Sequence, residues 1–367
     1  MKQIKAVLKQ VSAPQKDCAG TPVGLSDETI AERKQKVLAA MKARGLDQLI
    51  VYGDVEHGGN FEYLVGYFTR FEEALLVLNA NGKATLVLGN ENLNKAAKAR
   101  IKAAAVHVSL FSLPNQPMTD DGCLCDFFTQ AGIEAGMKIG VAGLVGWKLF
   151  TSPLEDNRQS YDIPSYVVEA VKAIVGETQL SNETGLFIGE NGVRTTNNAN
   201  EIAHYEYAAA LASDGVLDAM DKLELGVSEL ELGDALVCKG QHTSIVTIAS
   251  SGPRFIKANM FPTANTVKLG DPISLTVGYR GGSSSRAGVA VHNADELPEA
   301  QRDYLERVAG PYFSAYAAWL ETIHIGQTGG DLFNTVETVL PRAQYGWSLC
   351  PGHLSAEEEW MASPVYE

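Results

Sequence analysis

The fold of this chain is decided by residues 270–290, which read G-D-P-I-S-L-T-V-G-Y-R-G-G-S-S-S-R-A-G-V-A. A turn over Lys268–Pro272 leads into an apolar strand, and Gly281-Gly282 turns the chain again. Residues 288–291 then resume the apolar pattern. The stretch therefore predicts two consecutive strands joined by a glycine turn.

The sequence around this strand pair predicts helices and short strands. Apolar residues recur at helical spacing from Asn200 to about Leu223. Ser228 followed three residues later by Glu231 forms a capping box, so another helix begins there. The remaining predicted elements are a strand over 244–248 and helices over 299–323 and 328–345. Helices and antiparallel strands in this order indicate an α+β region.

The first half of the chain shows a different alternation of elements. Ser26 is a helix N-cap and Gly45 a helix stop, and loop-like residues 1–26 precede this helix as an arm. The predicted elements are helices over 26–44 and 95–105 and strands over 47–52, 73–78, 84–88, 106–110 and 138–142. This alternation of helix and strand indicates an α/β domain.

Composition narrows the classes of protein to which the chain can belong. Its 367 residues are 45% hydrophobic and 20% charged, typical of a globular protein with one or two cores. The net charge of −14 and the lack of a basic cluster argue against a nucleic-acid partner. With no run of 18 apolar residues and no secretory signal pattern, we expect no membrane span. Five scattered cysteines indicate free thiols in a reducing cytoplasm.

Several local phrases, in the same order along the chain, resemble the creatinase and aminopeptidase-P (Xaa-Pro peptidase) branch of the pita-bread metallopeptidases. Residues 60–67, N-F-E-Y-L-V-G-Y, are similar to that branch's N-x-x-Y-L-T-G-Y phrase. Residues 225–232, L-G-V-S-E-L-E-L, resemble its P-G-V-T-E-x-E-L turn, and Phe261-Pro262-Thr263 resembles its P-T phrase. Residues 200–203 match the start of its catalytic-domain helix.

The resemblance implies a two-domain organisation and a partner. It implies an N-terminal arm over 1–26, a creatinase-like α/β domain over 27–175 and an α+β pita-bread domain over 176–367. The last strands of the family domain, which carry two glutamate ligands, have no counterpart before Glu367, so we expect them to be absent or cut away. The family also implies a homodimer.

The resemblance places the family's metal ligands on residues that do not suit a metal. Its two aspartates fall on Thr276 and Ser283, or on Ser284 or Ser285 if the turn length differs. Hydroxyls without carboxylates are poor ligands for hard divalent cations. The ligand histidine falls on His353, and the substrate-side histidine falls on Asn259. We therefore expect no metal cofactor; manganese or zinc would indicate that these positions are misaligned.

Six residues are candidates for the site, each with a plainer alternative. His353 and His242 are proposed acid/base groups, although each is also consistent with an ordinary loop histidine. Arg286 is proposed to clamp a substrate carboxylate, or else to stabilise the fold. Asn259, Thr276 and Ser283 are proposed to bind substrate, unless they only satisfy buried backbone groups.

Two functions follow from these residues. The first is a divergent creatinase/Xaa-Pro-peptidase-like hydrolase that cleaves a C–N bond, amide or amidino, of a small amino-acid- or dipeptide-like substrate without the usual dinuclear metal centre. The alternative is a non-catalytic pita-bread protein that binds a small molecule or peptide. A third possibility is that the chain is an incomplete fragment.

Overall fold

The computed structural model describes residue 7 and residues 9–54, 58–69, 71–114, 122–143, 158–188, 191–258 and 260–347. These residues form two compact units, an N-terminal unit of residues 23–204 and a C-terminal unit of residues 205–347 together with residues before 23. The division falls within helix α7 (Ala199–Asp221), whereas the predicted boundary at 175 and 176 lies at the end of α5 (Ser165–Val175).

The first helix begins and ends where its sequence predicts. Helix α1 spans Asp27–Arg44, and the Ser26 side chain accepts a hydrogen bond from the backbone N–H of Thr29. Gly45 ends the helix with a positive φ of 63°, a conformation that glycine adopts without the steric cost of a side chain. The buried positions on α1, which include Ile30, Val37 and Met41, face the core of the N-terminal unit.

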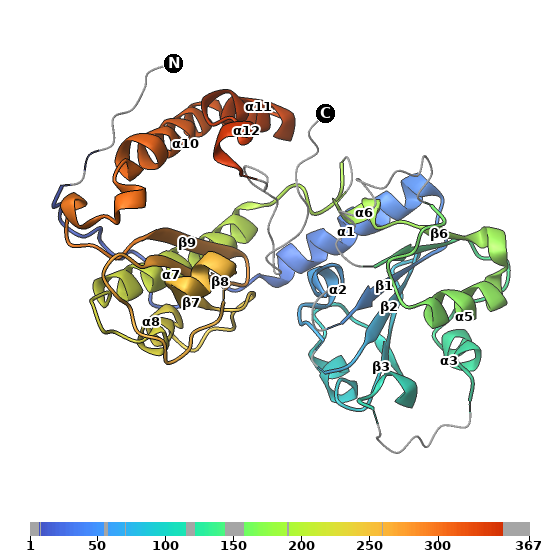
Figure 1. Cartoon of the computed structure of the whole chain (residues 1–367). Helices are drawn as coiled ribbons and strands as arrows, with labels where there is room; N and C mark the ends of the chain where they lie inside the picture. Colours follow the sequence, from blue (N-terminus) through green and yellow to red (C-terminus); the bar gives the residue numbers. More distant parts are fainter. Residues whose placement is uncertain are drawn as a thin grey trace. The chain divides into compact units, whose positions relative to one another are not determined.

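A mixed sheet forms the centre of the N-terminal unit (Figure 1). Its strands lie in the order β4-β3-β2-β1-β5-β6. Strand β2 is antiparallel to both of its neighbours, whereas β1, β5 and β6 run parallel to one another. The strands are β1 (Gln48–Gly53), β2 (Ala74–Asn79), β3 (Ala84–Leu88), β4 (Ala104–His107), β5 (Ile139–Ala142) and β6 (Leu180–Asn182).

Helices cover the sheet of the N-terminal unit and bury its central strands. Alternate residues of β1 and β2, such as Ile50 and Leu75, pack in one core with Phe128 of α3 (Leu124–Gln130) and Val171 of α5. Helix α2 (Gly59–Val65) packs on β1 and α1. The short elements are α6 (Gly185–Ile188) and the 3₁₀ turns η1 (Leu93–Lys98), η2 (Ser109–Phe111) and η3 (Glu177–Gln179).

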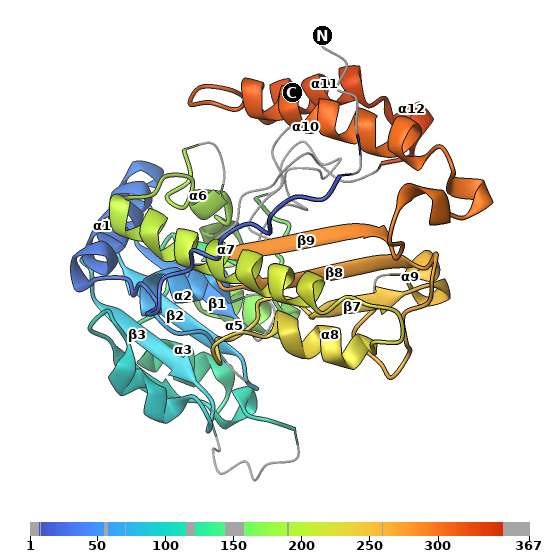
Figure 2. The ribbon, with the colours of Figure 1, turned by 90° about the vertical axis from the view of Figure 1, so that its left-hand side faces the viewer.

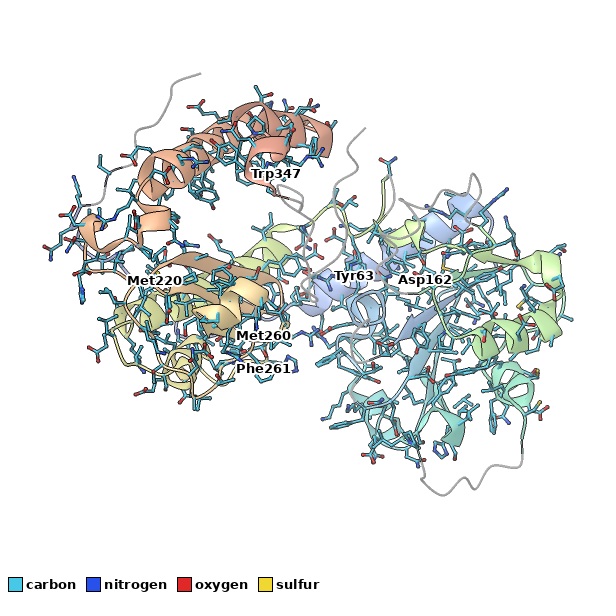
Figure 3. The ribbon with its side chains drawn as sticks, viewed as in Figure 1. Tyr63, Asp162, Met220, Met260, Phe261 and Trp347 are labelled. Carbon is cyan, nitrogen blue, oxygen red and sulfur yellow. The ribbon has the colours of Figure 1, made fainter. Side chains whose placement is uncertain are left out.

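Buried polar groups connect α1, α2 and the start of α7 within the N-terminal unit. The Arg33 guanidinium lies 4.3 Å from the ring centre of Tyr63, which is labelled in Figure 3. Arg33 Nε donates to Glu201 Oε1 at 2.7 Å, and both side chains are 1% exposed. Tyr63 donates its hydroxyl hydrogen to the carbonyl of Val193 at 3.1 Å. These contacts fix the beginning of α7 to the helices of this unit.

The C-terminal unit contains a smaller antiparallel sheet (Figure 2). Its strands β7 (Ile248–Ser251), β8 (Pro272–Tyr279) and β9 (Gly282–Val289) lie in that order. Helix α8 (Glu229–Leu236) packs on β7 and β8. The other elements are α9 (Pro253–Lys257), η4 (Ala294–Glu296), η5 (Glu299–Gln301), η6 (Leu305–Ala309), α10 (Gly310–Thr322), α11 (Gly329–Val339) and α12 (Arg342–Tyr345).

Three helix predictions and one strand prediction differ from the structure. The predicted helix over 328–345 is divided into α11 and α12 before Arg342, and the strand predicted over 244–248 is β7, which begins only at Ile248. The segment 95–105 forms the 3₁₀ turn η1 and then strand β4, because it has no apolar stripe to bury and β3 offers backbone partners to residues 104–107. The predicted helix over 299–323 is divided into η5, η6 and α10. Residues 305–309 are a π-helical segment that passes directly into α10, where Pro311 has no N–H to donate.

The α/β and α+β architecture predicted for the two parts of the chain is confirmed. Within the residues that the structure describes, none of the helices has the length and hydropathy to cross a bilayer.

Candidate functional site

The strand pair predicted from residues 270–290 is the hairpin β8–β9. Tyr279 pairs with Gly282, so the loop between the strands consists of Arg280 and Gly281. Gly281 has a φ of 102°, which a side chain would strain. A Cβ on Gly282 would lie 2.4 Å from the backbone nitrogen of Ala209 in α7. The two glycines therefore let the hairpin turn tightly and approach α7.

The register of this hairpin places Thr276 opposite Ser285 at the centre of the strands. Thr276 Oγ1 and Ser285 Oγ are hydrogen-bonded at 2.7 Å. Ser283 pairs with Gly278, two pairs nearer the turn and on the same face of the sheet. Ser285 is therefore the residue directly opposite Thr276, and the role of Ser283 in substrate binding stays a prediction.

More hydroxyls lie on the same face of the sheet as this pair. Side chains of directly paired residues share a face, and Ser250 of β7 pairs with Ser274 of β8. Ser250 is 1% exposed, and its Oγ has no hydrogen-bond partner among the described residues. Together with Thr276 and Ser285 these residues form what we call the hydroxyl face. None of the residues paired on this face is ionisable.

Arg286 lies on the other face of the sheet. It pairs with Leu275, which is 2% exposed, and successive residues of a strand point to opposite faces. Arg286 is exposed and donates to the adjacent Ser285 carbonyl at 2.6 Å. The register thus separates the Arg286 side chain from the hydroxyl pair, and its role in substrate binding stays a prediction.

The histidine and asparagine candidates lie in other segments. His242 is exposed and precedes Thr243, which bridges to Tyr279 at the turn end of β8. Tyr279 is three residues from Thr276, about 10 Å along the strand. His353 and Asn259 lie outside the described residues. The acid/base roles of His242 and His353 and the binding role of Asn259 therefore remain predictions.

A buried carboxylate next to this sheet was not among the candidates. Glu229, at the first position of α8, is 0% exposed. It accepts hydrogen bonds from Ser251 N and Oγ, Thr263 N and Oγ1, Asn265 Nδ2 and Arg254 Nε, at distances of 2.8–3.1 Å. Burial acts to raise the pKa of Glu229, but the donors from Thr263, Asn265 and Ser251 outweigh it and lower that pKa.

Glu229 therefore connects elements on the opposite side of the sheet, because its partner Ser251 follows Ser250 in β7 and points away from the hydroxyl face. Its donors come from the end of β7, from α9 and from Thr263 and Asn265, and Arg254 of α9 also donates to the carbonyl of Phe261, which Figure 3 labels. The sequence signal for this residue was its place directly after the N-cap Ser228, where carboxylates are favoured by the helix dipole. That signal cannot distinguish a buried carboxylate from an exposed one.

The residues at the centre of the hairpin do not fit the metal pair of the pita-bread metallopeptidases. Divalent metals of that kind require carboxylate or imidazole ligands, and Thr276 and Ser285 supply only neutral hydroxyls. Across the described ranges, no group of three or more His, Cys, Asp or Glu side chains is arranged to bind a metal ion.

Solved structures of X-Pro peptidases share this fold at low sequence identity. The Xaa-Pro dipeptidase from Bacillus anthracis is 16% identical with a TM-score of 0.63, over 90% of this chain and 83% of that one. The prolidase from Pyrococcus horikoshii OT3 is 16% identical with a TM-score of 0.65, over 90% and 83%. The X-Pro aminopeptidase from Thermotoga maritima MSB8 is 13% identical with a TM-score of 0.66, over 90% and 84%.

These matches define the class of fold. The chain has the prolidase and aminopeptidase-P type of pita-bread fold, so the resemblance inferred from its sequence phrases is confirmed at the level of structure. No family model and no curated protein sequence matches the chain. At 13–16% identity the likeness establishes architecture, and activity has to be argued from the site.

Proposed function

We propose that this protein is a divergent creatinase/Xaa-Pro-peptidase-like hydrolase that cleaves a C–N bond, amide or amidino, of a small amino-acid- or dipeptide-like substrate without a dinuclear metal centre. The observation that carries the proposal is the hydrogen-bonded pair Thr276–Ser285. It lies at the centre of the hairpin to which the resemblance assigns two metal-binding aspartates.

The chemistry of the hydroxyl face supports a neutral polar ligand. Each hydroxyl both donates and accepts, so Thr276 and Ser285 are able to bind the N–H and C=O of an amide when they release each other. Hydrolysis also needs a group that transfers protons, and in this proposal His353 and His242 supply it. Asn259 and Ser283 complete the binding contacts.

Binding without turnover is the second candidate function. It is favoured by the neutrality of the hydroxyl face, since no residue paired on that face is ionisable and a hydrolase needs an acid/base group beside the reacting bond. Under this alternative the same hydroxyls recognise the ligand, and the histidines have no catalytic role.

One set of measurements separates the two functions. The purified full chain is analysed for bound metal and incubated with Xaa-Pro dipeptides and with creatine, while product release and ligand binding are followed by chromatography and calorimetry. Thr276→Val and Ser285→Ala are compared with Ser284→Ala, which removes a hydroxyl from the opposite face of β9. Turnover that only Ser284→Ala retains supports the hydrolase.

The other outcomes are equally informative. Binding that depends on Thr276 and Ser285 without any product identifies the binding protein. Stoichiometric manganese, zinc, iron or cobalt contradicts the metal-free site. If none of these compounds binds, both functions are contradicted for this class of substrate.

We also propose that the protein is a homodimer. Sedimentation of the same sample tests this proposal.

A further inference from the structure

Two cysteines lie together at the beginning of α3, far from the hydroxyl face in sequence. Cys123 is the N-cap residue of the helix and Cys125 is its second residue. Both are free thiols; Cys123 is exposed and Cys125 is partly buried. An α-helix separates the Cα atoms of residues i and i+2 by about 5.4 Å, within the range of roughly 4.4–6.8 Å that a disulfide spans.

The N-cap conformation turns the first thiol toward the second. Two residues inside a helix point to different sides, but Cys123 has an extended backbone with φ −83° and ψ 162°. A side chain at that position folds back over the first turn. A disulfide would thus need only a small rearrangement of the two side chains.

The surroundings give the two thiols different roles. Burial is the main cause that raises the pKa of Cys125, and the neighbouring Cys123 raises it further. The Cys125 Sγ donates weakly to the carbonyl of Ala170 in α5 at 3.7 Å. Cys125 is therefore a protected thiol inside the contact between α3 and α5, whereas Cys123 is the thiol that an oxidant reaches from solvent.

We propose that Cys123 and Cys125 are a reversible redox pair that closes an internal disulfide when the protein meets a peroxide. The Cys123 sulfur attacks one peroxide oxygen, the O–O bond breaks, and a sulfenic acid and water form. The Cys125 sulfur then attacks Cys123, so that an S–S bond forms, the S–O bond breaks and a second water leaves with the Cys125 proton. Two thiols are oxidised and one hydrogen peroxide is reduced to two waters.

Formation of the disulfide changes the packing of the N-terminal unit. When Cys125 bonds to Cys123, its Sγ no longer donates to the Ala170 carbonyl. The contact between α3 and α5, which includes the buried Phe128 and Val167, loses one of its polar links. The pair therefore connects oxidation to the stability of the α3–α5 layer, independently of the function of the hydroxyl face.

The test exposes the full folded chain to hydrogen peroxide, removes the peroxide, and then unfolds the protein in guanidinium chloride with iodoacetamide so that every free thiol is alkylated, followed by digestion and mass spectrometry. In the wild type we expect the peptide with both cysteines to become lighter by two hydrogens and to resist alkylation, and dithiothreitol to reverse this. Cys238 serves as the internal control, because burial raises the pKa of its thiol; we expect it to react at least about tenfold more slowly.

Two single variants separate the roles of the thiols. In Cys125→Ser the sulfenic acid of Cys123 should persist and be trapped by dimedone, whereas in Cys123→Ser the Cys125 thiol should stay alkylatable at the same peroxide dose. The inference is overturned if both thiols of the wild type remain alkylatable. It is also overturned if oxidation yields only disulfides between chains or a sulfinic acid without an internal disulfide.

Discussion

Each unit of this protein contains a fully buried glutamate, and the two are stabilised in opposite ways. In the N-terminal unit, Glu201 is paired with Arg33 at 2.7 Å, and both side chains are 1% exposed. In the C-terminal unit, Glu229 is surrounded mainly by neutral donors, and its cationic partner Arg254 is 28% exposed. The first carboxylate has a buried cation and the backbone N–H of Asn198 as partners, and the second has several neutral donors.

The difference matters because the two arrangements fail differently. If either member of the Arg33–Glu201 pair is removed, the other remains a buried charge without its partner. Loss of the Glu229 charge leaves neutral groups that lack an acceptor, which costs less for each group. Glu229 connects β7 to α9 and to Thr263, whereas the Arg33–Glu201 pair fixes the start of α7. The comparison predicts a larger structural penalty in the N-terminal unit.

The largest effect is expected from Arg33→Met. This substitution leaves Glu201 buried without its cation, so we expect the unfolding free energy to fall by about 3–5 kcal/mol in urea titrations followed by circular dichroism. The double variant Arg33→Met/Glu201→Leu replaces both charges and should lose clearly less than the single one. Equal losses in the two variants would show that packing against Tyr63, and not charge pairing, dominates here.

The second effect is expected from Glu229→Gln, at about 1.5–3 kcal/mol near neutral pH, because the amide N–H₂ replaces an oxygen that accepts hydrogen bonds. The pKa of Glu229 is lower in the folded protein than the ordinary value of 4.5. Its contribution is thus fully present above pH 4.5 and is lost as the pH falls through the folded pKa. The gap between wild type and variant in urea titrations should shrink only below pH 4.5. A gap of constant size down to the lowest pH at which the protein folds would contradict this assignment.

The third effect concerns the packing of the β8–β9 hairpin on α7. Gly282→Ala places a Cβ 2.4 Å from the Ala209 backbone nitrogen, and we expect a loss of about 1–3 kcal/mol. Gly288→Ala on the same strand is a matched control, since no atom lies within 4 Å of its Cβ; its effect should stay within about 0.5 kcal/mol. Similar thermal midpoints for the two variants would mean that the hairpin does not depend on this close approach.

Sequence patterns predicted the helices whose ends are set by capping residues in the local sequence. Ser26 and Gly45 bound α1, and Ser228 caps α8, because caps act on neighbouring residues. Sequence patterns gave the wrong structure for residues 95–105, because the end of that segment pairs with strand β3. The facing residue Ser285 required the loop length of the hairpin, and the burial of Glu229 depends on Thr263 and Asn265, more than thirty residues away.

The smallest structural effect is expected at the hydroxyl pair itself. Thr276→Val and Ser285→Ala each remove one partner of a hydrogen bond between a half-buried and an exposed residue, so each should cost no more than about 1 kcal/mol. In a double-mutant cycle the coupling between the two substitutions should be about 0.5–1 kcal/mol. If ligand binding falls much more than stability in these variants, the pair serves recognition. Stability losses as large as that of Glu229→Gln would instead show that the pair stabilises the fold. The hydroxyl face would then no longer be the candidate ligand-binding site.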